Sequence, residues 1–319
     1  MQKEIIVFIQ IIYNFKVMKK IVIFFITLLL IECNTSKSKI RTDLERQDLK
    51  GKVKSIKSVA YRAIEKFGKI QKGNENSIFF YTFNKDGNFI ECISNEKENN
   101  SRQTFIYNDQ GNIIEQKEYD FKGNLKSQTT YSYDRKGNKI EENSFEGYQF
   151  RRSIYKYDNK CREVETLITI SIKGINGSIE LRKIKEYNNE GNIIEEKTYD
   201  NNNNLVIKGI YTYDEKGNII KNIFVGSDTN EIEEKYIYTY DKNSNKIEEQ
   251  KYISEHLVEK TIIKYDKKGN ILKKNITDFN RNMSFLITSK NDEKGNAIER
   301  IYYINGNPNV IEEIEIKYY

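Results

Sequence analysis

The chain has 319 residues, of which 53 are Lys or Arg and 47 are Asp or Glu, and its formal net charge is +6. One His and three Cys are too few for a structural zinc site or a disulfide framework, and a single Pro excludes Pro-rich or collagen-like segments. Apolar residues make up 37% of the chain and aromatic residues 12%, so we expect a core that depends on Tyr and Phe.

The N-terminal residues have the pattern of an export signal. Lys19 and Lys20 precede an apolar run at residues 21–31, and a polar stretch follows. A positive segment before an apolar run is typical of a secretory signal, and this run is too short to span a bilayer, which needs roughly 20 residues. We predict a signal peptide at residues 1–33, with the true start at Met18, and a polar tether at residues 34–44.

Cys33 stands where a bacterial lipoprotein signal carries its lipidated cysteine. Leu30 fits the position three residues before it, whereas Glu32 replaces the usual small residue. We predict lipidation of Cys33 and an exported protein, lipid-anchored in the bacterial cell envelope on the periplasmic or surface face of the outer membrane. The alternative is an ordinary signal peptide or an uncleaved anchor, in which Cys33 is incidental. The remaining charges alternate in sign without a basic stripe, so we expect no nucleic-acid partner.

A turn sequence of the form Tyr-Asp-x-x-Gly-Asn recurs nine times after residue 75, with an average spacing of 26 residues between Gly87 and Gly295. A weaker copy of the turn, such as residues 119–124, lies about 12 residues after some of them. Each unit is therefore predicted to be a β-hairpin and its connection. The predicted structural turn positions are Gly87, Gly111, Gly137, Gly191, Gly217, Gly269 and Gly295, with Cys161 and Ser244 replacing glycine in two units.

Three side-chain columns accompany the turn. An aromatic residue stands four before the turn glycine in eight of the nine units, an aliphatic residue three after it in all nine, and Glu follows that residue in seven. The repeat aromatics are Phe83, Tyr107, Tyr133, Tyr157, Tyr187, Tyr213, Tyr240 and Tyr265, and the Glu residues are Glu91, Glu115, Glu141, Glu165, Glu195, Glu248 and Glu299. Tyr residues two apart, such as Tyr131 and Tyr133, share one face of a strand.

The turn itself is predicted to be a type I turn closed by a G1 bulge. Asp or Asn at its start can accept hydrogen bonds from the backbone two residues on, and Gly can take the left-handed conformation of the bulge. Cys161 and Ser244 hold that position without the freedom of glycine, so we expect either mild strain or an irregular turn there.

The fold class that follows is all-β. About 18 to 20 strands in sequence exceed the roughly 10 that an open sheet holds without curling. We therefore predict tandem β-hairpin repeats forming a long coiled or spiral antiparallel meander, with residues 45–75 as an N-terminal capping hairpin and residues 76–319 as the repeats.

The segments at residues 131–140 and 211–220 resemble the YD repeat of the RHS family. The resemblance implies a coiled sheet of β-hairpins, and large members of the family form shells around toxin domains or act at cell surfaces. Here Asn replaces the Arg usual after the turn glycine. No toxin segment follows the repeats, so we do not expect a polypeptide cargo.

The residues that could carry chemistry also have structural explanations. The repeated Glu residues could be acids for glycoside hydrolysis, but repetition favours an exposed column facing Lys on neighbouring strands. The Asp and Asn of the turns could bind calcium, but turn capping is favoured. His256 is expected at the surface, and Cys92 and Cys161 are expected to be unpaired, with a disulfide as the alternative. We predict no catalytic residue, no metal site and no cofactor.

The function predicted from the sequence is that of a non-catalytic envelope or cell-surface repeat protein that mediates protein interaction or scaffolding. Its partners would be the membrane, through the lipid anchor, and an unknown envelope protein. A glycan-binding or cell-wall-binding module is the alternative, because exposed Tyr rows can stack on sugar rings, although the chain has no Trp. A glycoside-active enzyme is a distant third. The sequence leaves open whether the Tyr rows face a core or solvent.

Overall fold

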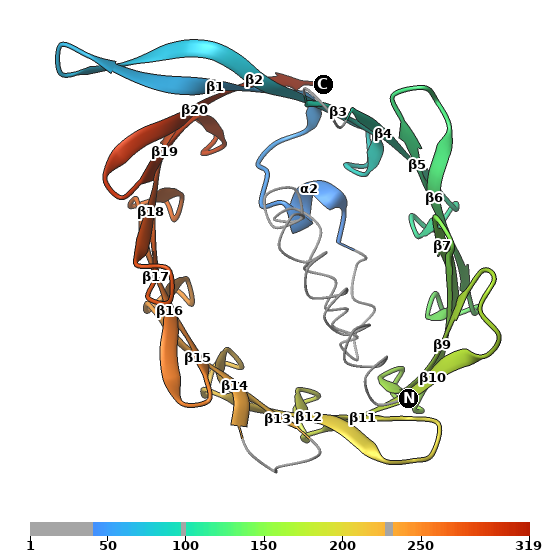
Figure 1. The fold of residues 1–319 in the computed structure, drawn as a ribbon. Helices are drawn as coiled ribbons and strands as arrows, with labels where there is room; N and C mark the ends of the chain where they lie inside the picture. Colours follow the sequence, from blue (N-terminus) through green and yellow to red (C-terminus); the bar gives the residue numbers. More distant parts are fainter. Residues whose placement is uncertain (1–40, 97–99, 227–231) are drawn as a thin grey trace.

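The computed structural model describes residues 41–96, 100–226 and 232–319. Twenty antiparallel strands form one sheet, in which each strand pairs with the next along the chain. The first strand, β1, also pairs with the last, β20, through partners such as Ile56 and Ile316. The sheet therefore closes on itself as a 20-stranded barrel (Figure 1).

The elements are α2 (Asp43–Arg46), β1 (Val53–Lys66), β2 (Lys69–Phe83), β3 (Phe89–Glu96), β4 (Ser101–Tyr107), β5 (Ile113–Asp120), β6 (Leu125–Tyr133), β7 (Lys139–Glu146), β8 (Gln149–Tyr157), β9 (Glu163–Ile172), β10 (Ser178–Tyr187), β11 (Ile193–Tyr199), β12 (Leu205–Tyr213), β13 (Ile219–Gly226), β14 (Ile232–Tyr240), β15 (Lys246–Ile253), β16 (His256–Tyr265), β17 (Ile271–Asp278), β18 (Met283–Asn291), β19 (Ala297–Ile304) and β20 (Asn307–Tyr318).

The predicted open, coiled or spiral meander is wrong. In an open ribbon β1 and β20 would each leave a row of backbone N–H and C=O groups unpaired, and closure removes both edges. Residues 45–75, predicted as a capping hairpin, contain the end of α2, all of β1 and the start of β2. Because β1 pairs with β20, this segment joins the two ends of the repeat array.

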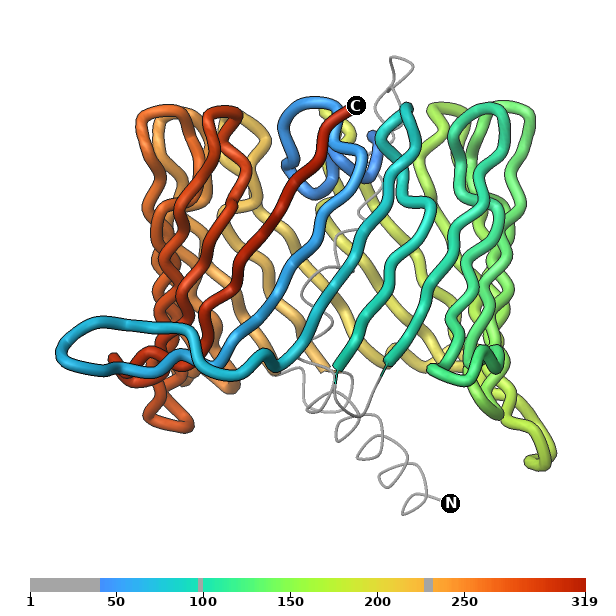
Figure 2. The backbone as a smooth tube through the Cα atoms, turned by 90° about the horizontal axis from the view of Figure 1, so that it is seen from above, coloured from blue at the N-terminus to red at the C-terminus, as the bar shows by residue number. Residues whose placement is uncertain are grey.

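The connections lie on two rims (Figure 2). Because consecutive strands run in opposite directions, the nine repeated turns all fall on one rim, which we call the turn rim. The remaining connections, beginning with the β1–β2 hairpin, fall on the other, which we call the opposite rim. The C-terminus lies at the turn rim (Figure 2).

Each of the nine turns has the geometry expected from the sequence. In the turn after β4, Gly111 N–H donates to Asn108 O and Asn108 N–H donates to Asn112 O, both at 2.9 Å. These are the bonds of a type I turn with a G1 bulge. The residue at the glycine position has a positive φ in all nine turns, including Cys161 at 60° and Ser244 at 64°, which confirms the expected strain.

The aromatic column faces the lumen. Helix α2 lies inside the ring (Figure 1), and the Tyr107 hydroxyl donates to Asp43 Oδ2 of that helix at 2.8 Å. Side chains alternate along a strand, so Ile106 and its cross-strand partner Glu115 point outward. The Tyr residues therefore line the interior of the barrel, and the Glu column lies on its outer wall.

Candidate interaction site in the barrel lumen

The tyrosines of the lumen are tied to the wall by a repeated hydrogen bond. In six consecutive units the hydroxyl donates to the backbone carbonyl two residues after the preceding turn glycine, at 2.6–2.9 Å. This carbonyl belongs to the bulge, where the strand ladder shifts register. The pairs are Tyr133 with Ile113, Tyr157 with Lys139, Tyr187 with Glu163, Tyr213 with Ile193, Tyr240 with Ile219, and Tyr265 with Lys246.

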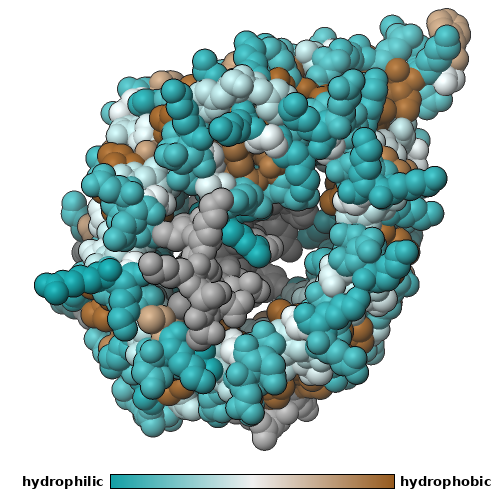
Figure 3. Space-filling model, turned by 180° about the vertical axis from the view of Figure 1, so that it is seen from behind, coloured by the Kyte–Doolittle hydropathy of each residue, from teal (hydrophilic) through white to brown (hydrophobic). Residues whose placement is uncertain are grey.

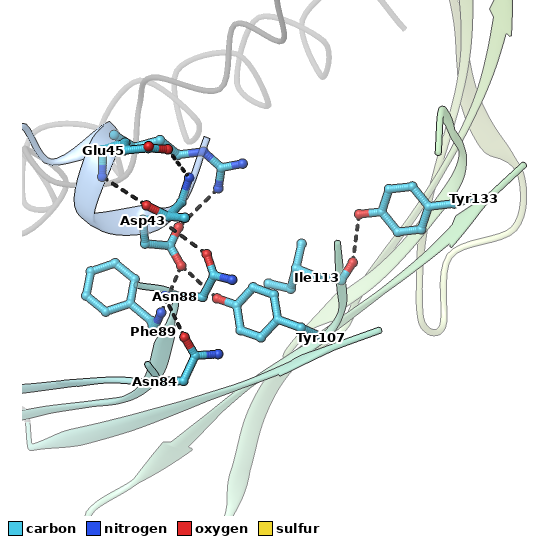
Figure 4. Close-up of polar contacts among 10 residues, drawn as sticks. Asp43, Glu45, Asn84, Asn88, Phe89, Tyr107, Ile113 and Tyr133 are labelled. Atoms are coloured by element: carbon cyan, nitrogen blue, oxygen red, sulfur yellow. Dashed lines mark hydrogen bonds and ion pairs between the residues drawn. The ribbon is translucent and has the colours of Figure 1, made fainter. Parts of the chain in front are cut away.

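The two ends of this tyrosine ladder differ from its middle. Tyr107 turns to Asp43 of α2, while Tyr133 reaches the carbonyl of Ile113 (Figure 4). Asn291 takes the place of tyrosine in the last unit, and its side-chain Nδ2 is buried without a hydrogen-bond partner among the described residues. The ladder therefore begins at α2 and ends at Asn291.

The tyrosine rings are half-buried in the wall and half-exposed to the lumen. The hydroxyls of the six ladder tyrosines are engaged by the wall, so these rings present an aromatic face rather than a free polar group. Burial raises the pKa of Tyr131 to about 12 and that of Tyr211 to about 12. The rows are thus neither a closed core nor fully solvent-exposed, the two arrangements that the sequence left open.

One charged cluster lies among the rings of β6, β7 and β8. Lys139 Nζ is 2.7 Å from Glu142 Oε2 and 4.4 Å from the ring centroid of Tyr155, and the Tyr155 hydroxyl donates to the same carboxylate at 3.0 Å. Burial disfavours both charges, but their attraction outweighs it, so the pKa of Lys139 is raised and that of Glu142 lowered. The pair stays ionised, which gives Glu142 none of the character of a general acid.

A second cluster of the same kind lies on β14 and β15. Lys246 pairs with Glu249 at 2.5 Å and stands 5.1 Å from the ring centroid of Tyr238. Lys251 Nζ is 3.0 Å from Glu234 Oε1 and 5.3 Å from the Tyr236 centroid. The lumen thus repeats a pattern of half-exposed aromatic faces beside paired lysines, a chemistry suited to binding.

The Glu column on the outer wall forms ion pairs. Six of its seven members pair with a Lys or Arg, through contacts such as Glu141 with Arg152 Nε at 2.7 Å and Glu248 with Lys260 at 2.9 Å. The hydrogen bond from Arg152 lowers the pKa of Glu141, and that from Lys260 lowers the pKa of Glu248. This confirms the expected charge pairing, and it leaves these carboxyls ionised.

The turn carboxylates are used within their own turns. Asp134 Oδ1 accepts from the N–H groups of Lys136 and Asn138 at 2.8 and 2.9 Å, and Asn138 Nδ2 donates to Oδ2 at 2.8 Å. This is turn capping, as favoured from the sequence. Within the described residues, no group of three or more His, Cys, Asp or Glu side chains could hold a metal ion.

The sequence did not identify the segment that joins the two ends of the barrel. Asp43 accepts from Phe89 N–H at 2.9 Å as well as from Tyr107, and Asn296 Oδ1 accepts from Lys50 N–H at 2.7 Å. At the C-terminus, Tyr318 donates to Asp292 Oδ2 at 2.6 Å. Residues 42–50 thereby link the first and last turns. The available signal was the capping box of Thr42 and Glu45, which starts α2.

Several residues that the sequence analysis singled out do not take part in the lumen or turn contacts described above. Cys33 and the signal peptide lie outside the described residues. Cys92 and Cys161 are free thiols, and His256 begins β16 at the opposite rim with an exposed side chain. The one helix in the described part of the chain has four residues, so no helix there is long and apolar enough to cross a membrane.

No protein-family profile matches the chain, and no curated protein sequence matches it. Among solved structures it is similar to the TcdB2-TccC3-Cdc42 complex (11% identity, 78% of this chain, TM-score 0.40), of whose matched chain it spans 15%. A porin-like protein from Bacteroides uniformis has 10% identity over 83% of this chain and 96% of its own, with a TM-score of 0.37. The Photorhabdus luminescens Tc holotoxin pore has 9% identity over 75% and 16%, with a TM-score of 0.30. At these values the similarities assign the chain to no family.

Proposed function

We propose that the protein is a non-catalytic scaffold of the cell envelope, exported and lipid-anchored at Cys33, which binds a partner protein on the lumen face of its barrel. The observation that carries the proposal is the row of half-exposed tyrosine rings beside the paired lysines Lys139 and Lys246. Aromatic residues supply much of the binding energy of protein interfaces. The resemblance to YD repeats, whose family includes cell-surface proteins, agrees with this role.

The charged residues of the outer wall favour a barrel that lies in water beside the membrane and does not span it. A barrel wall that faces lipid carries an apolar band about 25 Å tall. Here the outward column carries Glu in seven of the nine repeats, paired with Lys or Arg in six of them. One end of the barrel, seen in Figure 3, is also hydrophilic over most of its surface, with apolar residues scattered among the polar ones.

Neighbouring residues on the two faces of β5 give a direct test. Gln116 pairs with Phe105 on the lumen side, and Lys117 pairs with Thr104 on the outer side. A photo-crosslinking residue at position 116 is expected to capture one defined envelope protein in intact cells, and the same residue at position 117 is expected not to. Equal capture at both positions, or capture only at 117, would contradict the proposed lumen interface.

The lipid anchor is tested separately. Metabolic palmitate labelling is expected to disappear in the Cys33→Ala variant, while secretion of the barrel continues. Labelling that persists in this variant would remove Cys33 from the proposal and leave the lumen interface untouched.

Glycan binding remains the second candidate, because the half-exposed rings of Tyr131 and Tyr155 lie close together around Lys139 on the lumen side of the wall. If it is correct, a glycan array will show a defined ligand that Tyr155→Ala loses and the outer-wall variant Ile154→Ala keeps. A hydrolytic activity abolished by Glu142→Gln would instead contradict both binding proposals.

A further inference from the structure

The two rims of the barrel differ in chemistry. The tips of the turn rim carry polar or charged residues followed by Gly, Cys161 or Ser244, whereas five tips of the opposite rim expose a large apolar side chain. These residues include the four most exposed large apolar side chains of the described chain. They are Phe67 (101%), Tyr148 (72%), Phe121 (68%), Ile175 (60%) and Phe279 (48%).

Phe67 stands at the end of an arm. The β1–β2 hairpin is the longest of the barrel and projects beyond the wall (Figures 1 and 2). Phe67 at its tip has a φ of 53°, a left-handed conformation that is unfavourable for a bulky residue. Phe67 and Gly68 form the two-residue loop of this hairpin, whose type I′ turn has a positive φ at both positions. The ring of Phe67 is fully exposed at the tip.

Lysines lie beside two of these apolar tips, Phe67 and Phe121, whereas Asp278 precedes Phe279 and Glu146 lies two residues before Tyr148. Residues 62–72 of the arm contain Arg62, Lys66, Lys69 and Lys72 against one acidic residue, Glu65. Lys66 and Lys69 flank Phe67 and have no ion-pair partner within the described part of the chain. A similar arrangement occurs between β5 and β6, where Lys122 Nζ stands 5.3 Å from the Phe121 ring. Aromatic residues beside lysines are typical of protein surfaces that lie on an anionic bilayer.

We propose that the opposite rim binds a lipid surface with anionic headgroups, into which Phe67 and Phe121 insert while the neighbouring lysines contact the phosphates. The tips are separate points around one side of a ring, an arrangement that fits a flat partner and not a groove-bound peptide. Several shallow contacts act together once the first is made, so binding becomes strong without any large apolar patch. This inference rests on the envelope location of the proposed function and on none of its lumen contacts.

The rim and the proposed lipid anchor are compatible with one bilayer. Thr42 lies at the turn rim, beside Gly87. Nine residues, 34–42, reach at most about 30 Å, which is about the length of a strand of eight or nine residues. A tether that passes along the barrel therefore reaches the plane of the opposite rim.

The absence of Trp from the chain gives a clean test. Full-length variants with a single Trp, Phe67→Trp or Phe121→Trp, are mixed with vesicles of phosphatidylglycerol and phosphatidylcholine that contain brominated lipid. Both emissions are expected to shift to the blue and to be quenched. The matched control, Lys136→Trp at a tip of the turn rim, is expected to show neither change. Because this variant has the same N-terminal segment, the control separates insertion of the rim from binding through that segment.

A second variant measures the strength of the contact. Phe67→Ser with Phe121→Ser removes two exposed rings that support no packing, and it is expected to weaken binding to these vesicles by about tenfold or more. Pure phosphatidylcholine vesicles are expected to bind the unmodified rim less well. Unchanged Trp emission on vesicle-bound protein would overturn the proposal. So would a blue shift that depends on protein concentration without vesicles, because that result indicates contact between the rims of two copies. Neither result bears on capture by position 116 in the lumen.

Discussion

Tyr133 shows what the aromatic column does at the scale of a single residue. Its ring lines the lumen, and its hydroxyl donates to the carbonyl of Ile113 at 2.7 Å. That carbonyl lies beside the register shift between Ile106 and Tyr107, where the ladder is irregular. The sequence showed the column and its period, but the partner could not be read from it. Tyr133 and Ile113 lie on different strands, and the hydrogen bond depends on how the bulge turns the carbonyl.

Tyr133→Phe removes this hydroxyl while keeping the ring. We expect the free energy of unfolding to fall by about 1 kcal/mol, because the bulge carbonyl is left without a donor. Tyr148→Phe is the control, since its side chain is exposed at the opposite rim, and its effect is expected within about 0.5 kcal/mol. Denaturant unfolding of the two variants measures the difference, and equal effects would refute the structural role of the hydroxyl.

The raised tyrosine pKa values predict sensitivity to alkali. Burial raises the pKa of Tyr131 and of Tyr211 to about 12, whereas tyrosine in an unfolded chain titrates near 10. The folded state therefore holds the phenolic protons more tightly. The stability this confers is fully present below about pH 10 and is lost as the pH rises toward 12. Unfolding measured with ultraviolet titration of the phenols checks this, and a stability that does not change between about pH 9 and 12 would contradict it.

At the scale of an element, the turn is the part that the sequence predicted best. Its geometry depends on residues within five positions of one another, so the Asp cap and the left-handed residue follow from local chemistry. The strands between turns were also predicted, because period two is a local pattern. Only some tips of the opposite rim carry the weaker copy of the turn sequence, and the loop at Phe67 is not one of them. The sequence therefore gave no sign that Phe67 and Phe121 are exposed on the same rim until the two rims could be compared.

The left-handed position can be tested in both directions. Cys161→Gly is expected to stabilise the barrel by about 1 kcal/mol, because it relieves a positive φ of 60°. Gly217→Ala is expected to cost a similar amount, because residue 217 has a φ of 82°. An added Cβ would meet no atom within 4 Å, so this cost comes from the backbone conformation alone. Thermal unfolding compares the two, and a shift of the same sign in both variants would contradict the assigned turn.

At the scale of the whole molecule, closure of the sheet into a ring determines the architecture. This closure could not be predicted from the sequence. The repeat predicts a long series of hairpins, and the twist of the sheet predicts that this series curls. A spiral and a closed ring have the same local sequence pattern, so the repeat does not distinguish them. What closes the ring is specific to its two ends. Glu312 of β20 accepts from Ser58 of β1 and from Tyr302 of β19, both at 2.6 Å, and residues 42–50 link the first turn to the last.

The β1–β20 seam is therefore the place to test the account. Lys57 and Glu315 are register partners on the outer wall, and antiparallel partners stand about 4.5 to 5.5 Å apart at Cα, within the range of a disulfide. In the double variant Lys57→Cys with Glu315→Cys, mild oxidation is expected to form a disulfide within one chain, identified by peptide mass spectrometry. The pair Lys57→Cys with Lys290→Cys, which are not partners, is expected to stay reduced. A closed barrel predicts rapid intramolecular bonding between positions 57 and 315, whereas free thiols at both positions, or bonds only between molecules, would show that the ring is open.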